Sequence, residues 1–191
     1  MKNLKILAIA LVSIFTFSSC SDDDKPEPVV ENEVITTVTA VYTPVGGGTA
    51  ITLESKDLDG DGPNAPLISV SGNFVQGKTY TGVVTFLNET VSPAEDITEE
   101  IKELGLEHQI FYQKTGTINN VSYADTESNY DSSGKPVGLE SVFTTTGAAN
   151  GTLKITLRHE PNKSAANVAS GDITNAGGST DAEVVFAITV E

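Results

Sequence analysis

Residues 33–48 read Glu33-Val34-Ile35-Thr36-Thr37-Val38-Thr39-Ala40-Val41-Tyr42-Thr43-Pro44-Val45-Gly46-Gly47-Gly48. Val, Ile and Thr dominate the first part of this stretch, and such β-branched residues favour extended strands. A proline and three glycines then interrupt the run, after which Ile51 and Leu53 alternate with polar residues as far as Glu54. A strand, a glycine-rich turn and a second strand together predict an antiparallel hairpin.

Similar strand patterns recur along the rest of the chain. Further strands are predicted at residues 66–70, 79–87, 107–113, 116–123, 137–145, 152–160 and 182–190. Within residues 107–113, strand alternation places His108 on the same face as Ile110 and Tyr112. Residues 124–136 are polar and rich in turn-forming residues, so they are expected to form a loop.

One segment has helical instead of strand periodicity. Its apolar side chains recur at helical spacing, at Ile97, Ile101 and Leu104. Ser92 and Glu95 match a capping box, and Pro93 suits the first helical position. The pattern predicts one short inserted helix at about residues 93–104.

Many short strands with one inserted helix predict a mainly β fold. We expect an antiparallel β-sandwich of the Ig-like, Greek-key type. Residues 33–191 are predicted to form it as a single domain. The alternative is two small sandwiches that divide near residue 106.

The N-terminus has the pattern of an export and lipidation signal. Lys2 and Lys5 flank the start of an apolar run, Ile6 to Phe17, that is too short for a spanning helix. Two serines then precede Cys20, the only cysteine in the chain. Residues 1–19 are therefore predicted to be a lipoprotein signal peptide, with acyl chains such as palmitate attached at Cys20. An ordinary secretory signal with an incidental cysteine is the alternative.

Residues 20–32 are predicted to form a disordered acidic tether, because this segment has too few apolar residues to repay the cost of ordering. The acidic run after Cys20 resembles the surface-export signal of Bacteroidetes-type lipoproteins. This resemblance implies a lipid-anchored protein of the outer membrane, exposed at the cell surface. A periplasmic-facing location is the alternative.

The composition restricts the classes of partner. The chain has 26 acidic and 11 basic residues and a formal net charge of −15. Nucleic acids and anionic lipid surfaces need Lys and Arg, so the charge disfavours both. It favours cations as partners, or simply serves solubility.

The loop Asp57-Leu58-Asp59-Gly60-Asp61-Gly62 has the spacing of a calcium loop, in which alternate carboxylates converge on one hard cation. Asn64 adds a possible carbonyl ligand. Ile68 occupies the position at which an EF-hand carries its bidentate Glu, and strands are predicted on both sides. The loop therefore predicts a weak calcium site with the ligands Asp57, Asp59, Asp61 and Asn64. A solvated Asp/Gly turn is the alternative.

The two histidines, His108 and His159, lie at the ends of two predicted strands. If these strands are neighbours, the imidazoles would hold Zn²⁺ or Fe²⁺ together with a carboxylate. Hydrogen-bonded histidines without a metal are the alternative.

The sequence lacks the common catalytic motifs. It contains no G-x-S-x-G and no H-E-x-x-H, and its one thiol is assigned to the lipid. The protein is therefore predicted not to be an enzyme.

Several stretches together resemble an uncharacterised family of Bacteroidetes-type outer-membrane lipoproteins: Thr43–Thr49, Asp57–Pro66, Ser92–Ile101, Glu107–Gln109 and Gly171–Gly178. Some members carry the label type 1 periplasmic binding domain-like, although that fold needs repeated βαβ units and this chain has one predicted helix. The resemblance implies a partner role beside a TonB-dependent receptor and brings no catalytic residues.

Two functions follow as expectations. The first is a lipid-anchored surface protein that captures a nutrient or metal beside an outer-membrane receptor. The second is a structural or adhesive surface module in which calcium stiffens a loop.

Overall fold

The computed structural model describes residues 33–60, 62–125 and 133–191. The predicted signal peptide, the tether with Cys20, Asp61 and most of the predicted loop at 124–136 lie outside the described residues. Within the described residues, no helix has both the length and the apolar character needed to cross a membrane.

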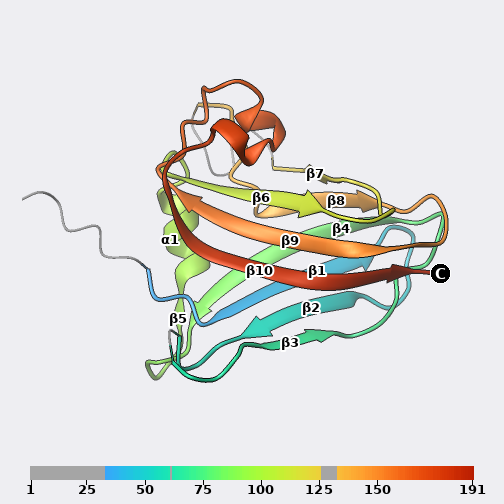
Figure 1. Ribbon diagram of the computed structural model, residues 1–191, viewed down its shortest axis with the longest axis horizontal. Coiled ribbons are helices and arrows are strands. Elements are labelled where there is room, and N and C mark those ends of the chain that lie inside the picture. Colours follow the sequence, from blue (N-terminus) through green and yellow to red (C-terminus); the bar gives the residue numbers. More distant parts are fainter. Residues whose placement is uncertain (1–32, 61, 126–132) are drawn as a thin grey trace, which may run out of the picture. The chain divides into compact units, whose positions relative to one another are not determined.

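The chain folds into two antiparallel sheets that face each other (Figure 1). In order across the first sheet lie β3 (Leu67–Val70), β2 (Ile51–Lys56), β1 (Thr37–Pro44), β4 (Thr79–Asn88), β8 (Glu140–Thr144) and β7 (Val121–Tyr123), with β5 (Glu95–Asp96) paired to β4. The second sheet contains β10 (Ser179–Val190), β9 (Ala149–His159) and β6 (His108–Lys114). The predicted mainly β, antiparallel sandwich with one helix is confirmed. The first sheet takes strands from both sides of residue 106, so both halves of the chain contribute to one core.

The predicted hairpin is confirmed as β1 and β2, which pair antiparallel with Tyr42 opposite Ile51. Its turn uses three glycines with positive φ, a conformation that other residues adopt only with strain. The predicted strand at 116–123 is shorter than expected, because only Val121–Tyr123 is paired.

The helix α1 (Ile97–Glu103) begins later than the predicted 93–104. Its N-cap is Asp96, whose carboxylate accepts a hydrogen bond from the Thr98 N–H at 3.0 Å. The predicted N-cap at Ser92 and start at residue 93 are wrong, because Glu95 and Asp96 are extended and pair with β4 as strand β5.

The core lies between the sheets, and α1 closes one end of it with Ile97 and Ile101. A second small cluster lies on the outer face of β6, where Phe111 packs against Val168 and Ala176. The segment that covers this face contains two short 3₁₀ helices, η1 (Val168–Ser170) and η2 (Ile173–Asn175). It leads directly into β10, which returns beside β9 to complete the second sheet.

Candidate metal centre

Two histidines meet at the end of the second sheet. The register of β6 and β9 places His108 directly opposite His159. Their rings lie 4.9 Å apart between centroids, and His108 Nε2 is 3.1 Å from His159 Nδ1. The structure therefore brings together the two side chains that the sequence offers as transition-metal ligands.

A hydrogen bond sets the orientation of the His108 ring. Its Nδ1 lies 3.1 Å from the carbonyl oxygen of Leu104, the C-cap residue of α1. A carbonyl only accepts, so Nδ1 carries the proton and donates it. In the neutral ring, the Nε2 lone pair then points toward His159. Metal-binding histidines are commonly fixed by such a second hydrogen bond to a backbone carbonyl.

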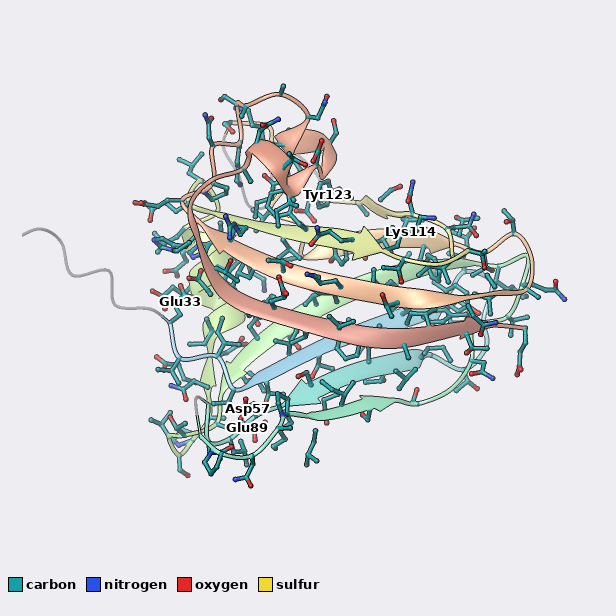
Figure 2. All side chains as sticks on the ribbon, in the orientation of Figure 1. Glu33, Asp57, Glu89, Lys114 and Tyr123 are labelled. Carbon is teal, nitrogen blue, oxygen red and sulfur yellow. The ribbon has the colours of Figure 1, made fainter. Side chains whose placement is uncertain are left out.

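Two carboxylates face the histidine pair. Glu33 Oε1 is 3.3 Å from His108 Nε2. Asp181 Oδ2 is 4.0 Å from His108 Nε2 and 3.9 Å from His159 Nδ1. The Asp181 side chain is only 2% exposed, and its Oδ2 is buried without a hydrogen-bond partner. Glu33 Oε2 is likewise buried without a hydrogen-bond partner. Figure 2 shows Glu33 near the start of the described chain, beside the sandwich.

Asp181 reaches the centre because β10 contains a bulge. Thr180 pairs with Arg158 and Ala182 pairs with Leu157, which leaves Asp181 as the extra residue between them. A bulge redirects a side chain out of the regular alternation of a strand. The Arg158 guanidinium holds the segment just before the bulge. It donates to the Gly177 carbonyl at 2.7 and 3.1 Å and to the Thr180 hydroxyl.

The turn before β10 also comes close to His159. Gly178 has a φ of 68°, and a Cβ atom at this position would lie 2.1 Å from the His159 carbonyl oxygen. Only glycine allows that approach. Gly178 is therefore a positioning residue for the backbone that carries His159.

The four groups perturb one another electrostatically. Burial lowers the pKa of His108, but the hydrogen bond and charge of Glu33, aided by the Leu104 carbonyl and Asp181, outweigh it and raise that pKa overall. Burial raises the pKa of Asp181, and the nearby Glu33 charge adds to this effect, while His159, His108 and Arg158 oppose it. The centre thus combines two carboxylates with two imidazoles, and Arg158 is close enough to act on Asp181.

The donor geometry fits a small divalent transition metal. Ligand nitrogens about 2.0–2.1 Å from a tetrahedral zinc ion lie about 3.3 Å from each other. The distances from His108 to His159 and to Glu33 are 3.1 and 3.3 Å. The ligand atoms of Glu33, His108 and His159 all lie within 4.8 Å of one another. Mixed imidazole and carboxylate donors suit zinc, iron and related ions.

A cavity of about 570 Å³ borders the centre on its carboxylate side. Glu33 and Asp181 form part of its wall, and Asp57 and Glu183 line it as well. The Glu183 carboxylate is paired with the Lys154 ammonium at 2.9 Å. The centre is therefore connected to a space whose described lining is predominantly acidic or neutral.

The predicted calcium loop is only partly brought together. Asp59 Oδ2 accepts hydrogen bonds from the Asn64 side-chain amide at 2.6 Å and from its backbone N–H at 3.3 Å. The hydrogen bond from Asn64 lowers the pKa of Asp59. The Asp57 side chain also interacts with that of Asp59 and lowers its pKa, while Asp57 Oδ1 is buried without a hydrogen-bond partner. Asp57 is one of the residues that line the cavity described above. Asp61 lies outside the described residues.

Sequence reasoning missed Glu33 and Asp181 as partners of the histidines. Glu33 stands at the start of the first strand pattern, where an acidic residue carries no metal signal. Asp181 precedes a strand pattern, and a bulge leaves no periodic trace in a single sequence. The only available hint was that both histidines needed a carboxylate to complete a centre.

Comparison of the chain with models of protein families, with curated proteins and with solved structures found no match.

Proposed function

We propose that this protein is a non-catalytic lipoprotein that binds a divalent transition-metal ion through His108, His159, Glu33 and Asp181. The observation that carries the proposal is the histidine pair, 3.1 Å apart, beside the buried and unpartnered Oδ2 of Asp181. An unpaired buried carboxylate is costly, and a bound cation relieves that cost.

The donor set supports capture of an ion over catalysis by it. Two imidazoles and two carboxylates supply four protein ligands. A zinc ion with four protein ligands has no position left for water or substrate, whereas catalytic zinc keeps one such position open. Nitrogen donors also favour a transition metal over calcium or magnesium, which take oxygen ligands.

The place of action is part of the same proposal. Acylation of Cys20 would anchor the protein in the outer membrane, with the acidic tether spacing the sandwich from the surface. A TonB-dependent receptor is the proposed partner, to which the captured metal would pass. Mass spectrometry of the mature protein tests the anchor, since the expected N-terminal residue is an acylated Cys20.

The metal site is tested by elemental analysis and zinc titration of residues 20–191 carrying Cys20→Ser, which removes both the lipid and a competing thiol. One zinc ion per chain is expected. The double variant His108→Gln/His159→Gln should weaken zinc binding by a factor of about 100 or more, since it removes two of four ligands. Circular dichroism checks that both proteins are folded. Equal zinc binding by a folded double variant would overturn the proposal.

A calcium-stiffened structural or adhesive module is the second candidate. The buried, unpartnered Oδ1 of Asp57 and the contact between Asp59 and Asn64 favour it. Calcium at ten times its Kd would then stabilise the fold by about 1.4 kcal/mol. A thermal melt in chelator and in millimolar calcium tests this, and identical melting curves would argue against it.

A further inference from the structure

We infer that the cavity beside the metal centre is its entry chamber, and that it admits the free hydrated divalent cation while excluding anionic metal chelates. Asp57 acts as the outer carboxylate that first attracts the ion. This inference rests on the proposed function, since it names the form in which the metal arrives.

The cavity connects the centre to the opposite sheet. Asp181 and Glu33 lie on its inner side, and the Asp181 side chain is 2% exposed with no hydrogen-bond partner for Oδ2. Asp57 follows β2 and contributes from the first sheet, with its own Oδ1 buried and unpartnered. Figure 2 shows Glu33 and Asp57 toward the same end of the sandwich. Three carboxylates that line one space, those of Glu33, Asp57 and Asp181, therefore each have a buried oxygen without a hydrogen-bond partner.

The charge of the lining selects for cations. Among the described residues that line the cavity there is no lysine or arginine, whereas four carboxylates line it. Glu183 is offset by Lys154, which leaves Glu33, Asp57 and Asp181 to set the local potential. Low-dielectric walls lined by one sign of charge focus the field and raise the local concentration of counter-ions.

The size of the cavity suits a hydrated ion. Six water molecules at about 30 Å³ each occupy about 180 Å³. The cavity of about 570 Å³ therefore holds an ion with its water shell. Selection against citrate-like chelates then depends on charge, because their carboxylates would face those of Glu33, Asp57 and Asp181 at close range.

The test is stopped-flow binding of Co²⁺ to the 20–191 chain carrying Cys20→Ser, followed by cobalt absorbance. Asp57→Asn should slow association about fivefold at low salt and leave dissociation unchanged, since one attracting charge is lost on the entry path. Asp172→Asn is the matched control: it makes the same change at an exposed residue that does not line this cavity. It should change the rate less than twofold.

Two further readouts keep the inference falsifiable if Asp57→Asn fails to fold. Association with the parent chain should slow as ionic strength rises, because screening weakens the field in the entry chamber. With citrate present, the rate should follow free Co²⁺ and not total cobalt. Equal rates for the two Asn variants, or a rate that follows cobalt citrate, would overturn the entry chamber while leaving the metal centre intact. Absence of any cobalt binding to the parent chain would overturn the proposed function itself.

Discussion

His108 Nε2 lies 3.1 Å from His159 Nδ1, although the two residues are 51 positions apart in the chain. Their contact follows from the register of β6 and β9, in which they are directly opposed. Directly opposed residues of an antiparallel pair bring their Cβ atoms to about 4.5–5.5 Å. The sheet itself thus preforms half of a metal site before any ion is present.

The first prediction concerns pH. The pKa of His108 is raised above 6.5 in the fold, so its contribution to stability is present below that value and is lost as the pH rises through the folded pKa. Asp181 also has a raised pKa, so it adds a change of the same sign from lower pH. In chelator, the free energy of unfolding should therefore fall as the pH rises above about 6.

With zinc present, the slope should be opposite over the same range. The ion binds neutral imidazole, so protons compete with it and its affinity increases with pH. Urea denaturation at several pH values, with chelator and with zinc, measures both slopes. The variant His108→Gln should flatten the slope in chelator. Parallel slopes in the two conditions would contradict a metal centre at His108.

The second prediction concerns Asp181 without metal and with bound zinc. At about pH 8 without metal, Asp181→Asn should stabilise the fold by about 1 kcal/mol, because it removes a buried charge whose Oδ2 has no partner. The same variant should weaken zinc binding by a factor of about 10 or more, since a ligand carboxylate is lost. Denaturation in chelator and zinc titration test the two effects. A variant that is destabilised in chelator would show that Asp181 has a structural partner instead.

The strands were predictable because local composition dominates them. The β-branched run of β1 and the glycines after it specify a hairpin without help from distant residues. The start of α1 was not predictable, because Ser92 and Asp96 are both good N-caps. The choice between them depends on β5 pairing with β4, which is a tertiary contact.

The centre was predictable only in its histidines. Sequence shows that His108 opens one strand and His159 ends another, but the pairing of β6 with β9 depends on the topology of the sheet. Asp181 depends on a one-residue register shift, which reverses the face that alternation assigns to its side chain. Glu33 is placed by the path of the chain before β1, where no periodicity applies.

The third prediction concerns the attachment of α1 to the sheet. The buried Thr98 hydroxyl accepts from the Phe86 N–H at 2.9 Å and donates to the Phe86 carbonyl at 3.2 Å. It thereby satisfies both polar groups of a β4 residue that lies beyond the paired part of β8. Thr98→Val should cost about 2–3 kcal/mol, because both groups lose their partner in the core.

The control for this variant is Thr98→Ser, which keeps the hydroxyl and loses one methyl group. It should cost about 1 kcal/mol. Urea denaturation of the two variants measures the difference. Equal losses would show that the methyl group, and not the hydrogen bonds, attaches α1 to β4.

The last prediction tests the support behind His159. Gly177 and Gly178 both have positive φ, at 63° and 68°, so an alanine at either position should cost about 1–2 kcal/mol in backbone strain. A Cβ at Gly177 would meet no atom within 4 Å, whereas one at Gly178 would lie 2.1 Å from the His159 carbonyl oxygen. Gly178→Ala must therefore displace the end of β9 as well as strain the turn. We expect it to lose more stability than Gly177→Ala and, unlike Gly177→Ala, to weaken zinc binding, measured by denaturation in chelator and by zinc titration. Equal zinc affinity in the two variants would mean that the close approach of Gly178 does not position His159.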